Sequence, residues 1–149
     1  MVEFALVVVL LIALLYGIIT YGLILAAQST ITQAAADAAR SGIVTTTPVA
    51  TAEAQACIDI GWMNKTCGTP ATGSYNTTNC TFSPNPADAI TAFACTKTCP
   101  SNVNNQCLTV SVSYNYSGAP LFPELPGLNV ITPSTISSTN VLQVSTPSS

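Results

Sequence analysis

The chain of 149 residues contains no histidine and very few charged residues of either sign. Its three basic residues are Arg40, Lys65 and Lys97, and six acidic residues bring the net charge to −3. Without histidine, the chain lacks the side chain that most often acts as a general base. Without a basic cluster, it lacks the electrostatic footprint of nucleic-acid binding. We therefore expect neither an enzyme nor a nucleic-acid-binding protein, and we expect no cofactor.

An uncharged, almost wholly apolar run over residues 4–27 dominates the start of the chain. A hydrocarbon core about 30 Å thick needs about 20 apolar helical residues to cross it, and this run supplies them. A cleaved secretory signal does not fit, because it would have a basic start and an apolar stretch of only about 7–15 residues. The helical pattern continues without a break to about Arg40, and Gly42 marks a stop. We expect residues 1–42 to form one long membrane-spanning helix and residues 43–149 an extracellular head.

All cysteines of the chain follow this helix. They are Cys57, Cys67, Cys80, Cys95, Cys99 and Cys107. An even number in a small extracytoplasmic domain predicts three disulfides, and six cysteines allow fifteen pairings, among which we expect a local link between Cys57 and Cys67. Zinc is the alternative, because the spacing of Cys95 and Cys99 occurs in zinc sites. No histidine and no second matching pair accompanies them, so the sequence favours disulfides and no metal.

The first part of the head predicts short helices and loops. Thr47 as a cap and Pro48 in the first turn begin a short amphipathic helix that ends before Gly61. Its inward face carries Val49, Ala52, Ala56 and Ile60. Residues 64–83 are rich in turn formers, so we expect irregular loops with at most one short strand, around residues 80–82. A cap, a first-turn proline and an early acid predict a third, brief helix over residues 85–94.

The second part of the head predicts strands. Residues 107–116 alternate between apolar and polar side chains, which is the period of a half-buried strand, and a looser alternation predicts a strand over residues 135–144. The loop between them is punctuated by prolines, and its apolar residues are Leu121, Phe122, Leu125 and Leu128. We expect this loop to pack on its own chain, with an adjacent subunit as the alternative. The predicted fold class is α+β: a long N-terminal hydrophobic helix and a small disulfide-stapled head with short helices and an antiparallel β-hairpin or sheet.

The helix resembles the TadE-like pilin and pseudopilin family, a tight-adherence group of type IV pilin-like proteins. The matching residues are Glu3-Phe4-Ala5-Leu6, the aliphatic run after them, Gly17-Ile18-Ile19-Thr20-Tyr21-Gly22, Gln28 and Ala34-Ala35-Ala36-Asp37-Ala38-Ala39-Arg40. The strand over residues 108–114, the proline-rich loop and the final strand are similar to the distal half of that family. Residues 45–105 have no counterpart in the resemblance.

The resemblance implies a structural subunit that is held in the inner membrane by one helix and processed by a prepilin peptidase. Pilus assembly machinery would then add it to a helical homo-oligomer, an extracellular pilus or fimbrium that serves adhesion. One alternative is a minor pseudopilin that initiates or caps a pilus made of another protein. A second alternative, from a different class, is a membrane-anchored adhesin that never polymerises.

Glu3 is the expected assembly residue. In such subunits the acidic residue usually lies fifth after the cleavage point, whereas here it is third. We therefore expect two further residues and a short basic leader ahead of Met1, with an unusual processing frame as the alternative. An unpaired carboxylate beside apolar surface is costly, so Glu3 would pair with the N-terminal ammonium of a neighbouring subunit and set the axial register. The alternative is that Glu3 rests among lipid headgroups at the positive end of the helix.

Small residues along the helix are the expected packing surface. Gly17 and Gly22 predict close approach of neighbouring helices, with local unwinding in the polymer as the alternative. The alanines expected to let neighbours approach are Ala26, Ala27, Ala34, Ala35 and Ala38. Candidate glycosylation sites are the Asn-x-Ser/Thr sequons at Asn64, Asn76, Asn79 and Asn115, although such triplets also arise by chance in a chain rich in threonine and asparagine.

Overall fold

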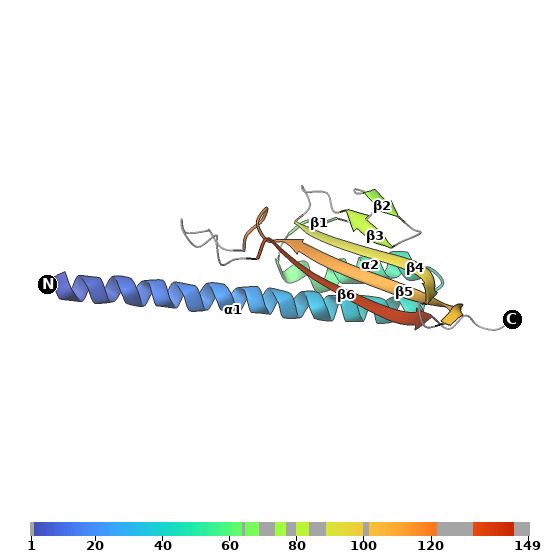
Figure 1. Ribbon diagram of the computed structural model, residues 1–149, viewed down its shortest axis with the longest axis horizontal. Coiled ribbons are helices and arrows are strands. Elements are labelled where there is room, and N and C mark those ends of the chain that lie inside the picture. Colours follow the sequence, from blue (N-terminus) through green and yellow to red (C-terminus); the bar gives the residue numbers. More distant parts are fainter. Residues whose placement is uncertain are drawn as a thin grey trace.

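The computed structural model is a long helical rod with a small head packed on its C-terminal half (Figure 1). It describes residues 2–63, 65–68, 74–76, 80–83, 89–99, 102–121 and 133–144. The rod is α1 (Val2–Ile43), a single helix of 42 residues. At 1.5 Å per residue it is about 63 Å long, which is roughly twice the thickness of a bilayer's hydrocarbon core.

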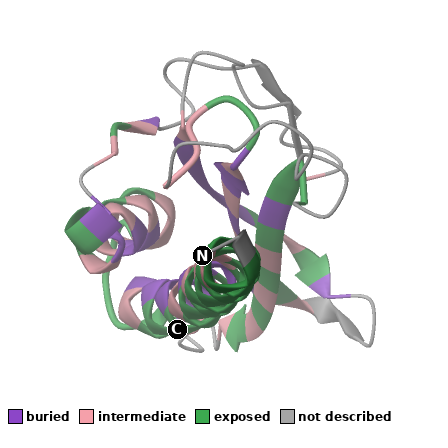
Figure 2. Cartoon of the chain, turned by 90° about the vertical axis from the view of Figure 1, so that its left-hand side faces the viewer, coloured by how far each residue is buried: buried purple, intermediate pink, exposed green. Residues whose placement is uncertain are grey.

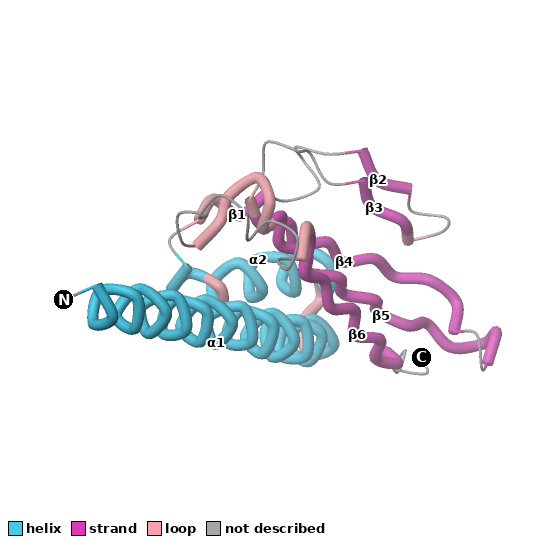
Figure 3. Tube along the Cα trace, turned by 60° about the vertical axis from the view of Figure 1, so that its left-hand side comes forward, coloured by secondary structure: helices cyan, strands magenta, loops and turns pink. Residues whose placement is uncertain are grey.

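A short connector reverses the chain, and α2 (Pro48–Asp59) returns alongside α1 (Figures 1 and 3). Pro48 occupies the first turn as predicted, and Ala52 and Ala56 are fully buried. Thr47 stands at the cap position, but its side chain makes no capping hydrogen bond, so the expected side-chain cap is wrong. A short 3-10 helix, η1 (Gly61–Met63), continues the path beyond α2.

The main sheet has four strands in the order β1-β4-β5-β6. They are β1 (Cys67–Gly68), β4 (Ile90–Cys99), β5 (Asn102–Asn115) and β6 (Thr135–Val144). β1 is parallel to β4, and β4 and β6 are each antiparallel to β5, which lies between them. A separate antiparallel pair, β2 (Ser74–Asn76) and β3 (Thr81–Ser83), lies above the sheet in Figure 1. The α+β class predicted from the sequence is confirmed.

Both helices cover one face of the main sheet. α1 contacts β5 and β6, and α2 contacts β4 and β5. The strand predicted over residues 107–116 is the C-terminal part of β5, and its apolar side chains at Leu108, Val110, Val112 and Tyr114 are completely buried. The strand predicted over residues 135–144 is β6, with the same bounds.

The hydrophobic core joins three layers of the chain. It contains Ile31 and several alanines from α1, Ala52 and Ala56 from α2, and the inward residues of the sheet. Alanine has almost no side chain, so α1 can lie close to β5 and β6 without leaving voids. The interior of the head is therefore built partly from the C-terminal half of the long helix.

The third helix predicted over residues 85–94 is wrong, because Ile90–Ala94 belong to strand β4. β4 is a central strand between β1 and β5, and its first six residues are buried without interruption. A short continuous apolar run fits a strand buried on both faces as well as it fits a buried helix, so periodicity alone does not separate them. Residues 84–88, which carry the expected cap and proline, lie outside the described residues.

The expectation of at most one short strand within residues 64–83 is also wrong, since β1, β2 and β3 all fall there. These strands are two or three residues long. Such segments are too short to show an alternating pattern, and their partners rather than their own sequence decide their conformation.

Three disulfides connect the elements of the head. They join Cys57 to Cys67, Cys80 to Cys95, and Cys99 to Cys107. The first pairing is the local link expected from the sequence, and it ties α2 to β1. Cys95 and Cys99 have different partners, so neither thiol is available to a metal. Among the described residues no group of histidine, cysteine, aspartate and glutamate side chains is arranged to hold a metal ion.

Candidate assembly surface

The N-terminal half of α1 projects beyond the head, and Figure 2 shows the end of the helix that faces the viewer coloured mostly as exposed. The exposed residues of this half are mostly apolar. Twelve large apolar residues between Phe4 and Tyr21 are each 49–76% exposed. The sequence has no charge between Glu3 and Asp37. Soluble monomers rarely expose continuous apolar patches of this size, so the projecting half of α1 requires lipid or protein around it.

From Ile24 onward α1 becomes amphipathic. Its buried face against the head consists of Ile24, Ala27, Ile31, Ala34, Ala35, Ala38 and Ala39. Its exposed face is polar and includes Gln28, Thr32 and Asp37. The helix therefore changes from wholly apolar to compatible with water at the level where the head begins.

The projecting half of α1 contains few polar side chains, and the hydroxyl of Thr20 is hydrogen-bonded to the backbone of the same helix. The Thr20 hydroxyl donates a hydrogen bond to the carbonyl oxygen of Tyr16 at 2.8 Å, which makes threonine tolerable in apolar surroundings. Gly17 and Gly22 are both exposed, and a Cβ added to either would have no atom within 4 Å. Both positions leave room for a neighbouring helix, while close packing and local unwinding there both stay predictions.

Glu3 lies in the first turn of α1 and is exposed. Arg40, the only basic residue of the helix, stands in the last turn at the opposite end. It lies 3.9 Å from Asp37, and both side chains are largely exposed. A cationic partner for Glu3 therefore has to come from outside α1.

The expected alanine surface is mostly covered by the chain itself. Ala27, Ala34, Ala35 and Ala38 are at most 1% exposed because they pack against the head. Only Ala26 of that set lies on the exposed face of α1. The sequence identified the alanines as packing residues, but it did not show that the neighbour is the head of the same chain.

The remaining candidate residues are only partly described. Leu121 is half-buried against the core of its own chain, whereas Phe122, Leu125 and Leu128 lie outside the described residues. Asn64 and Asn79 also lie outside them, and Asn76 belongs to β2. The Asn115 Oδ1 accepts hydrogen bonds from the Ser117 hydroxyl at 3.0 Å and the Gly118 N–H at 3.1 Å. Glycosylation at the sequons stays a prediction.

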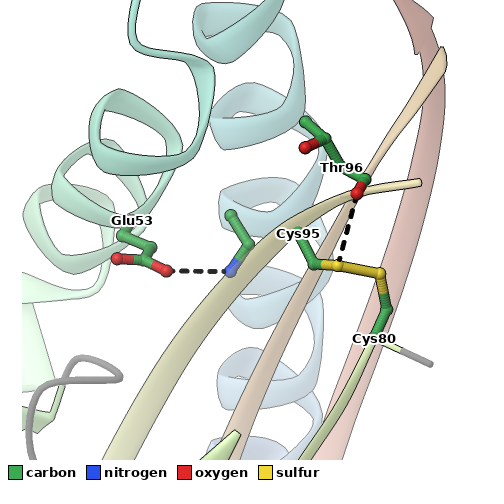
Figure 4. The surroundings of a disulfide bond; sticks show 5 residues. Glu53, Cys80, Cys95 and Thr96 are labelled. Atoms are coloured by element: carbon green, nitrogen blue, oxygen red, sulfur yellow. Dashed lines mark hydrogen bonds between the residues drawn. A yellow bond between two sulfur atoms is a disulfide. The ribbon is translucent and has the colours of Figure 1, made fainter. Parts of the chain in front are cut away.

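Glu53 is a structural carboxylate that the sequence did not single out (Figure 4). Its Oε1 accepts a hydrogen bond from the Ala94 N–H of β4 at 3.1 Å. The two residues of β1 pair with Ile90 and Thr91 of β4. Further along the same edge, the Glu53 carboxylate is the hydrogen-bond acceptor for the Ala94 N–H. Burial raises the pKa of the Glu53 carboxyl above its ordinary value of 4.5, although the hydrogen bond from Ala94 lowers it.

Two large apolar side chains that the sequence analysis did not single out are exposed on the head. Ile58 in α2 is 69% exposed, and Trp62 in η1 is 54% exposed. Ile58 lies in the last turn of α2 and Trp62 three residues beyond its end, in η1, whereas the nearby Ala56 and Ile60 are buried. The available signal was an isoleucine outside the predicted inward face, followed at helical spacing by the only tryptophan of the chain.

Comparison with known proteins found a family match for the long helix. Residues 1–40 match the family model of TadE-like proteins. This TadE-like segment comprises nearly all of α1 and none of the strands of the head. Comparisons with curated proteins and with solved structures found no match.

The TadE-like match agrees with the resemblance seen in the sequence, and it covers residues 1–40 of the 149. The family is structural rather than catalytic, and it is associated with the cell surface. Among the described residues, Glu3–Ile43 form a helix that is long and apolar enough to cross a membrane. The apolar, TadE-like end of the chain is therefore its candidate functional surface.

Proposed function

We propose that this protein is a structural pilin subunit that self-assembles through α1 into an extracellular Tad pilus for adhesion or surface contact. Before assembly, it would be held in the inner membrane as a single-pass precursor, processed there by a prepilin peptidase and extracted by the pilus machinery. The observation that carries the proposal is the projecting half of α1, which is apolar on every side.

The size of this surface decides against a free monomer in water. Fully burying a valine, leucine, isoleucine or phenylalanine side chain contributes about 1.5–3 kcal/mol. Covering the exposed parts of eleven such residues and of Tyr21 is therefore worth on the order of 15–20 kcal/mol. A typical domain has a net stability of only about 5–15 kcal/mol. Lipid before assembly and copies of the same helix after assembly are the two environments that satisfy this surface.

The length of the projecting segment supports the membrane precursor. Ile24 is the first buried residue along α1, so residues 2–23 extend beyond the head. These residues span about 33 Å at 1.5 Å per residue, close to the thickness of a hydrocarbon core of about 30 Å. The head would then begin at the membrane surface.

Glu3 supports assembly rather than simple anchoring. It is exposed at the start of the apolar segment, and Arg40 lies at the far end of the same helix. In a bundle of α1 helices, an N-terminal ammonium of another subunit would satisfy this carboxylate and fix the axial position of each added chain. Breaking a buried ion pair by removing one partner costs about 3–5 kcal/mol, which is enough to prevent addition of a subunit.

The proposal is tested with the full chain in cells that carry tight-adherence machinery. Sheared extracellular material is imaged by electron microscopy, and its protein is identified by mass spectrometry, which also maps the natural N-terminus. We expect helical filaments composed of this chain. The Glu3→Gln variant should reach the membrane normally and yield no filaments. Asp37→Asn is the matched control, because Asp37 is a carboxylate on the exposed polar face of the same helix.

Each contrary outcome has a definite meaning. Detection only in the membrane fraction contradicts the filament and favours an anchored protein that does not polymerise. Trace amounts in a filament made of another protein favour a minor pseudopilin that initiates or caps a pilus. Normal filaments from the Glu3→Gln variant contradict the role of Glu3 in setting the register and leave self-assembly in place.

A further inference from the structure

Ile58 and Trp62, here called the base patch, form an exposed apolar surface on the head. Both side chains are more than half exposed. Ala50 and Ala54 occupy earlier turns of the same exposed face of α2. The large apolar side chains are thus confined to one end of this face, which is not the arrangement of a continuous groove for a neighbouring helix.

The base patch lies at the end of the head nearest the projecting half of α1. α2 runs back along α1, and its 12 residues cover about 18 Å. A Cβ on Gly42 would lie 2.8 Å from the Pro48 carbonyl oxygen, so α2 begins beside the C-terminal end of α1. The far end of α2 is then level with a part of α1 about 12 residues nearer the N-terminus, and η1 continues beyond it. In Figure 1 the green end of α2, where η1 follows, lies beside the middle of α1. Trp62 is therefore near the level of Ile24, where α1 leaves the head.

The level of Ile24 is also where the apolar segment of α1 ends. A helix segment that matches the hydrocarbon thickness brings the residues just beyond it into the headgroup region. Tryptophan is enriched in that region because its ring is apolar and its N–H remains hydrated. Lys65, one of only three basic residues in the chain, follows shortly after η1 and is attracted to anionic lipid.

We propose that the base patch rests in the headgroup region of the membrane that α1 spans before assembly, and so fixes the height and tilt of the head on the bilayer. This inference rests on the membrane-spanning precursor of the proposed function. It adds a second contact with the membrane, made by the head itself. A lone helix anchor leaves the head free to swing, whereas a second contact restricts it.

The test uses the full chain, because Trp62 is its single tryptophan and reports the site without a label. The chain is reconstituted in vesicles of phosphatidylcholine and phosphatidylglycerol, and co-flotation with the vesicles measures membrane association separately. Tryptophan fluorescence is quenched by iodide in the buffer, by nitroxide on lipid headgroups, or by nitroxide at the ends of the acyl chains. We expect blue-shifted emission, strong quenching from headgroup nitroxide, and an iodide quenching constant severalfold below that of a hydrated tryptophan.

The hydrated reference is the double variant Trp62→Phe with Val44→Trp. Val44 follows α1 at the opposite end of the head and is 84% exposed. Its tryptophan should respond to iodide and not to either lipid quencher. A second pair of variants keeps Trp62: Ile58→Asn should raise iodide quenching of Trp62, and Ala54→Asn, one turn further from the base, should leave it unchanged.

Three results overturn the inference. If the chain floats with vesicles but Trp62 behaves like the hydrated reference, the head does not dock while the membrane-spanning helix stands. If the chain fails to float, the membrane precursor fails and the docking fails with it. If Trp62 is shielded only in assembled filaments, the base patch is a contact between subunits and not a lipid contact.

Discussion

Removing the Glu53 carboxylate should destabilise the head through one backbone group of β4. In the Glu53→Ala variant, the Ala94 N–H loses the acceptor that lies 3.1 Å away. Ala94 is 3% exposed, so water reaches this N–H poorly. An unsatisfied buried donor costs about 1–3 kcal/mol. Because Glu53 itself is only half-buried, we expect a loss near the lower end, about 1 kcal/mol.

The Glu53→Gln variant separates the hydrogen bond from the charge. The glutamine amide oxygen can accept the same bond from Ala94 but carries no charge that has to be desolvated. Burial is the main cause of the raised pKa of Glu53, so the native state disfavours the charged form. At neutral pH we therefore expect Glu53→Gln to be at least as stable as the unchanged chain.

The pH dependence gives the sign of this effect. The folded-state pKa of Glu53 lies above the ordinary value of 4.5, so the native state binds the proton more tightly than the unfolded state. The resulting stabilisation is fully present below pH 4.5 and is lost as the pH rises through the raised pKa. The unfolding free energy of the unchanged chain, minus that of Glu53→Gln, should fall over this interval and then level off.

The assay is guanidinium unfolding of the full, disulfide-intact chain in detergent micelles, followed by near-ultraviolet circular dichroism at several pH values. Taking the difference from Glu53→Gln cancels the titration of all other groups. A Glu53→Ala variant as stable as the unchanged chain would refute the role of the hydrogen bond. A difference that rises with pH would refute burial as the dominant influence on the Glu53 pKa.

Two further predictions concern the junctions of the head. A Cβ added at Gly42 would lie 2.8 Å from the Pro48 carbonyl oxygen, so Gly42→Ala should cost about 1–3 kcal/mol in the same unfolding assay, whereas alanine at the open Gly22 should cost nothing. Burial raises the pKa of Tyr114 to about 12, and its hydroxyl donates to the Ala119 carbonyl oxygen. Tyr114→Phe should therefore remove the tyrosine absorbance change near pH 12 and cost about 1 kcal/mol, and retention of that absorbance change would contradict the assignment.

The elements with a long repeating pattern could be predicted from the sequence. α1 has an uninterrupted apolar run, and β5 alternates strictly between Leu108 and Tyr114, so each pattern has one structural explanation. β4 could not be predicted, because its buried run from Ile90 to Ala94, apolar except for Thr91, is short and is compatible with a helix. Only the partners on both sides, β1 and β5, decide its conformation.

The candidate site also has one part that the sequence predicts and another part that only the fold reveals. The apolar surface of α1 follows directly from composition, because no fold of this chain could bury the whole segment in a head of this size. The role of the alanines required the fold, since Ala34 and Ala38 are equally consistent with contact to another subunit and with contact to β5 and β6. The base patch could likewise be identified only from the fold, because the exposure of Trp62 depends on how α2 packs against α1.

The continuity of α1 constrains how a subunit could pass from membrane to filament. The same helix presents its apolar segment outward up to residue 23 and contributes its alanines to the core of the head from Ala27 onward. Sliding the head along α1 would remove Ala34 and Ala35 from the core and expose apolar surface at both ends. The head should therefore keep its position on the helix, and the whole subunit should move as one body. Assembly would then exchange lipid for neighbouring helices along residues 2–23 while the disulfide-linked head stays folded.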